Sequence, residues 1–420
     1  MCSSDLAGLA KFKPGCLERM TDRQIATTDN FLRPVDYGDS ALVMTPALSM
    51  SARLLGSQND GVYRWFDEAG FQRQPHAIQG PLSEYPGLAM HASRTKPLAG
   101  VWELQPIDEE FLRWQAPTFE LSRAFDKLAF RTGWSDDDQY VLLEGVGGKP
   151  NHAHREANGI VRLNHRGRHW IVSNGYGRRA GLTNVTQSFT SRQIGPEDHN
   201  LLVLRRAGQV VTDQPMVTLL QHGANDNVLH ATTALLNYSG VDWFRTLVIV
   251  AGQYAVVIDR VQIIEDGLEK AHIEWNCLGS PSAVPAGYRL EQQRVFMDVT
   301  SISSGWSSAR READQSGCWL NVLGSGAYPF ARFPLQKLVY ELPSVARGQA
   351  HFLVTLLSAH HGQPTHELTP SQPGQVTVKG EQGVTRTVRL VDQDLSLEVN
   401  ATACVIGFGK IPLAPAMGAV

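Results

Sequence analysis

The chain has 420 residues, which is more than one compact hydrophobic core normally organises, so we expect two or more packed units. Its hydrophobic fraction of 42% and charged fraction of 19% are ordinary for a folded globular protein. A net charge of −3 excludes nucleic-acid binding driven by bulk charge, and no apolar run is long enough to span a membrane.

The five cysteines are odd in number and widely separated: Cys2, Cys16, Cys277, Cys318 and Cys404. No CxxC pair occurs, so neither a disulfide framework nor a cysteine-based metal site is expected. One bridge between Cys277 and Cys318 stays open at this point. This low cysteine usage is typical of a cytosolic protein, and equally of a bacterial periplasmic one whose core needs no disulfides.

The first residues, MCSSDLAGLAKFKPG, lack the apolar core of a signal peptide. The string CSSDL corresponds to what a common sequencing-adapter end would encode in one reading frame. We therefore expect the natural start to lie upstream, so that this segment carries no information about localisation.

The N-terminal part of the chain has a helical pattern. Asp39 and Ser40 can cap a segment whose apolar residues recur every three to four positions and which ends at Gly56. Shorter helical stretches are expected at 60–69 and 108–114. The connection QAPTFE then ends the helical character.

From about Leu121 the chain changes to short runs rich in Val, Ile, Leu and aromatic residues, separated by Gly, Asn and Asp. This rhythm is typical of a large antiparallel β-sandwich. We therefore predict a mainly β protein with segregated helices and strands, divided into a helical part at 1–117, a sandwich at 118–345 and a small C-terminal β unit at 346–420.

The segment from Gly147 to Gly177 concentrates groups that can do chemistry. His152 and His154 are two positions apart, so in an extended strand their side chains point to the same face. A turn at 164–167 predicts a β-hairpin that brings Tyr176 to the same end as the two histidines. Farther along the chain, His199 precedes another predicted strand.

Other side chains of this region have a purely structural interpretation. His165 and His169 flank the predicted turn and are expected to be solvated. The arginines are expected to be mostly solvated strand ends, with Arg155 and Arg178 facing a ligand, because the arginine fork suits carboxylates and sulfates. The complete arginine set of this region is Arg155, Arg162, Arg166, Arg168, Arg178, Arg179, Arg205 and Arg206.

Four stretches of the chain together resemble the heparinase II/III-like polysaccharide lyases. They are FRTGWSDDDQYVLLEGVGG, NHAHREANGIVRLNHRGRHWIVSNGYG, EDHNLLVLRRAGQ and DWFRTLVIVAGQYAVVIDRV. They occur in the family's order, and the resemblance covers roughly residues 30 to 270. It implies an antiparallel β-sandwich packed on an α/α toroid, of which residues 1–117 would be a remnant.

The resemblance also implies a reaction, β-elimination at a uronic acid. A base removes the C5 proton, the bond to O4 breaks, and an unsaturated sugar remains. Because the C5 proton is weakly acidic, the neighbouring carboxylate must be neutralised by hydrogen-bond donors or positive charge. A histidine or tyrosine then serves as the base, and a tyrosine protonates the leaving oxygen.

The family's roles can be carried onto matching positions of this chain. His152 matches the catalytic or carboxylate-neutralising histidine, and Tyr176 lies where the family often has a tyrosine in its site. His154 and His199 match two histidine ligands of a structural zinc ion. Asn151, together with Arg155 and Arg178, is expected to bind the substrate.

Two departures from the family pattern stand out. Ser173 occupies the position of the aspartate that is usually the third zinc ligand, and Glu156 or Asp198 could replace that carboxylate. The family's remaining acid/base residues belong to the toroid, well upstream of the histidine pair. Only about 115 residues precede the predicted sandwich, and Tyr37 matches the last toroid helices rather than the catalytic tyrosine. We therefore expect a catalytically incomplete chain.

The leading interpretation is a polysaccharide lyase that acts on an anionic, uronate-containing glycan and is located in the bacterial periplasm or cell envelope, or is secreted. The alternative is a carbohydrate-binding or structural β-sandwich without turnover. A metal-dependent hydrolase built on His152, His154 and His199 is a third interpretation. We expect no nucleic-acid partner and no membrane insertion.

Overall fold

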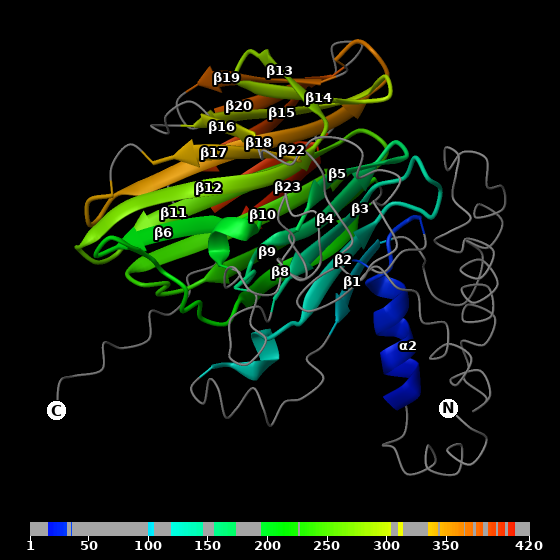
Figure 1. Cartoon of the computed structure of the whole chain (residues 1–420). Coiled ribbons are helices and arrows are strands. Elements are labelled where there is room, and N and C mark those ends of the chain that lie inside the picture. The colour runs from blue at the N-terminus through cyan, green and yellow to red at the C-terminus, as the bar shows by residue number, and fades with distance from the viewer. Residues whose placement is uncertain are drawn as a thin grey trace, which may run out of the picture.

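The fold, seen in a computed structural model, is a β-sandwich with an extra sheet on one side; the described residues include one α-helix, which lies on the other side (Figure 1). The mainly β prediction is confirmed. The structure describes residues 16–31, 35, 100–104, 119–145, 155–173, 195–225, 227–303, 310–313, 335–342, 345–364, 366–372, 375–380, 385–391, 394–399 and 402–407.

The first sheet contains ten strands among the described residues, in the order β1-β2-β3-β4-β5-β12-β17-β16, with β6 attached to β12 and β7 attached to β6. All of its pairings are antiparallel. The bounds are β1 Gly100–Leu104, β2 Lys127–Arg131, β3 Tyr140–Glu144, β4 Ile160–His165, β5 Arg168–Val172, β6 Leu202–Arg206, β7 Gln209–Val210, β12 Leu268–Leu278, β16 Arg310–Ala313 and β17 Leu335–Glu341.

The second sheet has eight described strands in the order β13-β14-β15-β18-β11-β10-β9-β8, and the third has five, from β19 to β23. The bounds in the second sheet are β8 Thr218–Asn225, β9 Val228–Leu235, β10 Val241–Val250, β11 Tyr254–Ile263, β13 Ser280–Val284, β14 Gly287–Gln292, β15 Val295–Ser303 and β18 Ala350–His360. In the third they are β19 His366–Gln372, β20 Gln375–Gly380, β21 Thr385–Val391, β22 Asp394–Val399 and β23 Thr402–Gly407. The predicted C-terminal stretch thus contributes β18 to the sandwich and the next five strands to a separate sheet.

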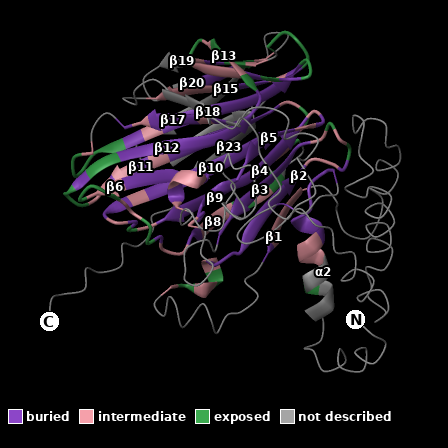
Figure 2. Ribbon diagram, viewed as in Figure 1, coloured by how far each residue is buried: buried purple, intermediate pink, exposed green. Residues whose placement is uncertain are grey.

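Strand β10, an interior strand of the second sheet, has a continuous hydrophobic character because both of its faces are covered. Trp243, Leu247 and Ile249 point into the core shared with the first sheet. Phe244 and Val248, on the opposite face, pack in a second cluster that contains residues of β19 and β20. Both faces of β10 are therefore buried, as the purple colour of Figure 2 shows, and a strand buried on both faces needs no polar alternation.

Helix α2, Cys16–Ala26, lies beside β1 and β2 (Figure 1). Its last residue, Ala26, packs with Leu104, Tyr140 and Val161 on the outer face of the first sheet. The helices predicted at 39–56, 60–69 and 108–114 lie outside the described residues. Two short 3-10 helices occur in the described part of the chain, η4 Leu121–Arg123 and η5 Pro196–Asp198.

Within the described part of the chain, no helix is both long and apolar enough to cross a lipid bilayer. Cys277, on β12, is a free and fully buried thiol. Its burial raises the pKa of the thiol far above the ordinary value, so the thiol stays protonated and unreactive.

Candidate functional site

Three polar side chains meet at one end of the hairpin formed by β4 and β5. The Ser173 hydroxyl lies 2.7 Å from Nδ1 of His199 and 3.4 Å from Oε2 of Glu156. The same Glu156 oxygen is 3.6 Å from the His199 ring nitrogen. All three are buried, with exposed fractions of 4% or less. We call Glu156, Ser173 and His199 the site cluster.

The backbone around the site cluster is fixed by Asn200, the next residue after His199. Its amide nitrogen donates to the carbonyls of Ile160 on β4 and Val172 on β5, at 2.8 and 2.9 Å. Its side-chain oxygen accepts from the backbone N–H of Asn276 on β12. One buried amide therefore ties three strands together and sets the position of His199.

A buried ion pair supports the site cluster from the second sheet. Arg245 and Asp259 are cross-strand partners on β10 and β11, fully buried, with Nε to Oδ1 at 2.8 Å. A second guanidinium nitrogen of Arg245, Nη1, donates to the carbonyls of Asn158 and Asn200, at 2.9 and 2.8 Å. Trp243 donates its ring N–H to Asp259. These contacts connect the sandwich core to two of the three chain segments that carry the site cluster, those of Glu156 and His199.

A second group of buried charges lies at the ends of β2 and β3. Lys127 Nζ is 2.8 Å from Glu144 and 3.1 Å from Asp126, and Asp126 also pairs with Arg23 of α2. The pKa of Glu144 is raised, chiefly because the carboxyl is buried. The charge of Lys127 acts in the opposite direction, and the nearby charge of Glu156 raises the pKa further. The site cluster therefore interacts electrostatically with this charged group, which in turn contacts the helix.

The segment that follows α2 packs on the first sheet, where Asp29 takes part in a third group of buried polar side chains. Asp29, Arg162 and His169 have no exposed surface, and Arg162 Nη1 lies 3.3 Å from Asp29 Oδ2 and 3.0 Å from His169 Nδ1. His169 also bonds Asn164 at 2.6 Å, and the edge of its ring meets Phe31. The prediction that His169 is solvated is wrong, because the chain after α2 covers this face of the sheet.

The same correction applies to His165. Its side chain is 2% exposed, and burial, with a contribution from Arg166, lowers its pKa to about 3. Imidazole at this position is therefore neutral at physiological pH. The turn itself was predicted correctly: Arg166 and Gly167 both have positive φ, at 51° and 68°, as a tight two-residue hairpin turn requires.

The arginines of this region bind the protein itself rather than solvent alone. Arg166 and Arg168 donate to the carbonyls of Ala359 and Gln292, which ties the hairpin turn to the second sheet. Arg205 pairs with Glu197 at 2.6 Å, and Arg206 donates to the carbonyl of Ser239. Together with the buried Arg162, these contacts contradict the expectation that the arginines are mostly solvated strand ends.

Arg131 begins the segment RTGW at 131–134 of the family-like stretch FRTGWSDDDQYVLLEGVGG, and the structure describes all four of these residues. Its guanidinium stacks over the rings of Trp134, at 3.5 Å, and Tyr140, at 4.4 Å, and donates to Asn30 and to the carbonyl of Thr28. Burial lowers its pKa to about 10, so it remains charged at neutral pH. The stretch therefore serves to dock the chain that follows α2.

Of the predicted site residues, the structure brings together His199, Ser173 and Glu156, and it places Arg155 immediately before Glu156 at a half-buried position with φ of 58°. Asn151, His152, His154, Tyr176 and Arg178 lie outside the described residues. Their chain positions flank the site cluster, because 151–154 precede Arg155 and 176–178 follow Ser173.

The site cluster bears on the choice between Glu156 and Asp198 as a replacement carboxylate. Asp198 accepts a hydrogen bond from the backbone N–H of Gly195 at 2.9 Å and thereby closes η5. Glu156 is the carboxylate beside His199. An imidazole and a carboxylate are ligand types that zinc uses, although the described residues contain no group of three or more His, Cys, Asp or Glu side chains arranged for a metal.

Several solved structures share this fold, and three of them are named heparinase III or heparan sulfate lyase. A heparinase III matches with a TM-score of 0.61 at 11% identity, over 88% of this chain and 51% of that one. The heparan sulfate lyase HepC from Pedobacter heparinus matches with a TM-score of 0.57 at 13% identity, over 93% and 52%. A further heparinase III structure gives 0.60 at 12% identity, over 91% and 56%.

At these identities the likeness shows a shared fold, and the chain spans about half the length of these proteins. No protein-family model and no curated protein sequence matches the chain.

Proposed function

We propose that this chain is the β-sandwich part of a polysaccharide lyase that cleaves a uronate-containing glycan by β-elimination. The observation that supports the proposal is the fold, which nearly the whole chain shares with heparinase III and the heparan sulfate lyase HepC. In sequence, Glu156 of the site cluster follows His152 and His154 closely, which agrees with the proposal.

The proposed reaction needs no cofactor in its electron balance. A base takes the C5 proton of the uronate, and the electrons of that C–H bond form the C4–C5 double bond. The bond from C4 to the glycosidic oxygen breaks, and that oxygen takes up a proton from a general acid. Cleavage therefore requires one base, one acid and a group that stabilises the developing charge on the carboxylate.

We assign these roles to residues on the chain segments next to the site cluster. His152 would neutralise the carboxylate or act as base, and Tyr176 would exchange the proton. Asn151, Arg155 and Arg178 would bind the uronate carboxylate and any sulfate groups. The rigid framework around His199 would hold both segments in place, and in a longer protein the toroid would supply the remaining acid/base groups.

We further propose that Glu156 and His199, together with His154, would hold a structural zinc ion. Such an ion would cross-link the two chain segments rather than take part in the elimination. The fit rests on the buried Glu156 carboxylate, which lies against the His199 ring where the family aspartate is replaced by Ser173.

The zinc proposal predicts a measurable metal content. The chain purified without chelator is expected to contain about one zinc ion per molecule, and the charge-removing variant Glu156→Gln is expected to lose most of it. Glu291→Gln, an exposed position on β14, is the matched control and should retain the metal. A metal-free wild-type protein whose thermal unfolding is unchanged by chelator would exclude the proposed ion.

We propose a periplasmic, cell-envelope or secreted location, because a polymeric anionic substrate of this kind is met outside the cytoplasm.

The lyase proposal predicts an unsaturated product that absorbs in the ultraviolet. The chain should be assayed against heparan sulfate, alginate, glucuronan and ulvan beside a version extended upstream through the natural gene. We expect product from the extended protein. A His152→Ala variant of that protein should lose at least about 100-fold in rate, which is the lower range for removing a general acid or base.

The same assay tests the alternative, a carbohydrate-binding β-sandwich without turnover. This alternative is favoured by Ser173, which stands where the family usually has the aspartate ligand of zinc. Glycan binding by both forms without any unsaturated product would contradict the lyase proposal and support the alternative. Full activity of the His152→Ala variant would remove the role assigned to that residue.

A further inference from the structure

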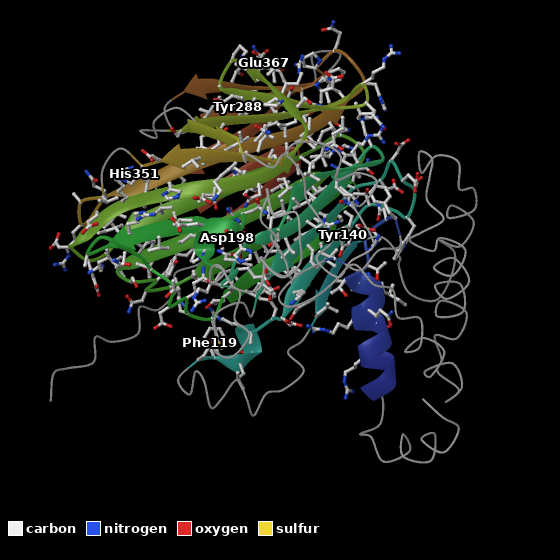
Figure 3. The ribbon with its side chains drawn as sticks, in the orientation of Figure 1. Phe119, Tyr140, Asp198, Tyr288, His351 and Glu367 are labelled. Atoms are coloured by element: carbon white, nitrogen blue, oxygen red, sulfur yellow. The ribbon has the colours of Figure 1, made fainter. Side chains whose placement is uncertain are left out.

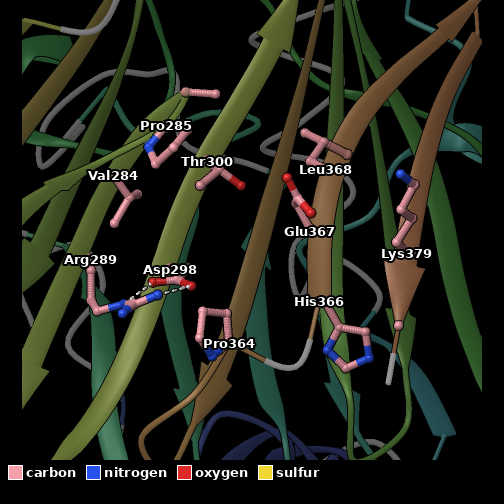
Figure 4. Close-up of a pocket in the computed structure, with 12 residues that line it drawn as sticks. Val284, Pro285, Arg289, Asp298, Thr300, Pro364, His366, Glu367, Leu368 and Lys379 are labelled. Atoms are coloured by element: carbon pink, nitrogen blue, oxygen red, sulfur yellow. Dashed lines mark hydrogen bonds and ion pairs between the residues drawn. The ribbon is translucent and has the colours of Figure 1, made fainter. Parts of the chain in front are cut away.

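A cavity of about 470 Å³ lies between the second and third sheets, far along the chain from the site cluster. Residues of β14, β15 and the turn between β13 and β14 form one side, and residues of β19 and β20 form the other (Figure 4). Figure 3 shows Glu367, at this cavity, and Asp198, beside the site cluster, on separate parts of the molecule. The volume of the cavity suits a small ligand.

One side of the cavity is rigid. Asp298 is 5% exposed and accepts two hydrogen bonds from Arg289, at 2.7 and 3.0 Å. Its second oxygen also lies 3.3 Å from His360, which is fully buried. Burial alone would raise the pKa of Asp298, but these neighbours keep it below the ordinary value. The carboxylate is therefore ionised, and it neutralises the charge of Arg289.

The other side presents polar groups that the protein leaves unused. Glu367 and Lys379 are cross-strand partners on β19 and β20, and both are exposed. Neither of these two side chains makes a hydrogen bond or an ion pair with any residue that the structure describes. Across the cavity, the hydroxyl of Thr300 is buried and also has no hydrogen-bond partner among the described residues. A buried hydroxyl without a partner costs free energy, and a bound ligand can remove that cost.

The formal charges at the cavity cancel, because the cations Arg289 and Lys379 face the anions Asp298 and Glu367. An anionic ligand such as a uronate or sulfate therefore gains no net attraction. The unused groups comprise a pure acceptor, a pure donor and a hydroxyl that can do both. Aliphatic side chains of Val284, Pro285 and Leu368 also line the cavity, as does the ring of His366. A neutral molecule with adjacent hydroxyls and C–H faces matches this combination.

We propose that this cavity binds one unit of a neutral saccharide, whose hydroxyls donate to Glu367 and accept from Lys379 and Thr300. The binding site is separate from the candidate lyase site and does not depend on it. It would let the protein hold a glycan at a second place without cleaving it there.

The test is saturation-transfer NMR on the whole chain, with cellobiose and N-acetylglucosamine as neutral probes. Glucuronic acid and glycine serve as anionic and zwitterionic probes. We expect transfer to the neutral sugars and much weaker transfer to the other two. Transfer to neither neutral sugar, or a preference for glucuronic acid or glycine, would overturn the proposal.

Three variants locate the binding. Thr300→Val keeps the side-chain shape, while Glu367→Gln and Lys379→Met keep the length of exposed side chains whose replacement leaves folding intact. Each is expected to weaken sugar binding about tenfold, because each removes or weakens one hydrogen bond to the ligand. Glu291→Gln and Lys270→Met are matched controls at exposed positions outside the cavity, and both should bind as the wild type does.

Unchanged sugar binding in all three cavity variants would place the binding elsewhere and overturn the proposal. The readout is independent of the lyase proposal, because the probes lack the uronate linkage that β-elimination requires. Suppose that the protein binds cellobiose but forms no unsaturated product from the uronate polysaccharides of the lyase assay. That result would contradict only the lyase proposal.

Discussion

Replacing Asp259 with alanine is expected to lower the free energy of unfolding by about 3–5 kcal/mol, the range observed when one partner of a buried ion pair is removed. The variant leaves the guanidinium of Arg245 fully buried without its counter-charge, and the ring N–H of Trp243 without its acceptor. The measurement is the urea midpoint followed by tryptophan fluorescence, because Trp243 and Trp275 both lie against Arg245.

The matched control is Asp266→Ala, an exposed position between β11 and β12, which is expected to change stability by less than about 0.5 kcal/mol. The double variant Asp259→Ala/Arg245→Met should lose less free energy of unfolding than the sum of the losses in the two single variants, since the unpaired charge is then gone. A shift of the Asp259→Ala midpoint no larger than that of the control would contradict the assigned role of the ion pair.

Replacing Lys127 with methionine is expected to destabilise the protein by a similar amount, about 3–5 kcal/mol near neutral pH. The methionine side chain fills nearly the same volume, so the effect isolates the loss of charge. Glu144 would lose its only ion-pair partner among the described residues, whereas Asp126 would keep Arg23. Lys270→Met, an exposed position on β12, is the matched control.

This second effect should depend on pH in a defined direction. The pKa of Glu144 is raised in the folded protein, chiefly by burial, so its protonated form is favoured there. The stability linked to this group is present below its unfolded pKa and is lost as pH rises through the folded pKa. Without Lys127 that loss becomes larger, so the difference from wild type should be smaller at pH 5 than at pH 8. An equal difference at both values would show that the cost of Lys127→Met does not come from Glu144.

The sheets could be predicted from the sequence because each strand carries its own signal. Glycine, asparagine and aspartate mark the turns, and the runs between them are too short for helices. The positive φ of Arg166 and Gly167 confirms the hairpin that was expected at 164–167. By contrast, nothing in the sequence of β10 says which neighbouring sheet covers each face, since both faces are equally apolar.

The interior position of His169 and Arg162 could not be predicted from the local sequence. Their partner Asp29 lies more than 130 residues earlier in the chain, and a histidine and arginine beside a turn favour the prediction of an exposed face. Helix α2 was also missed. Its C-terminal end is held by Tyr140, whose hydroxyl donates to the carbonyl of Ala26, and this contact cannot be read from the local sequence CLERMTDRQIA.

For the candidate site, the resemblance pointed to His199 and to the exceptional Ser173, and the structure places both in one cluster. The different contacts of Glu156 and Asp198 could be seen only in the fold, where Glu156 lies beside His199 and Asp198 accepts from the backbone of Gly195. The supporting role of Arg245 also needed it, since its two carbonyl acceptors come from segments that are distant in the chain.

The pairing of β12 with β5 has a consequence for how the chain is made. The two strands meet only where Cys277 pairs with Ile171, and about a hundred residues separate these positions. At a translation rate of roughly 5–20 residues per second, β5 leaves the ribosome about 5–20 s before its partner. During that interval the hairpin beside the site cluster has an unpaired edge that can pair with other chains. Covering this edge with a chaperone, or shortening the interval, is therefore expected to raise the yield of folded protein.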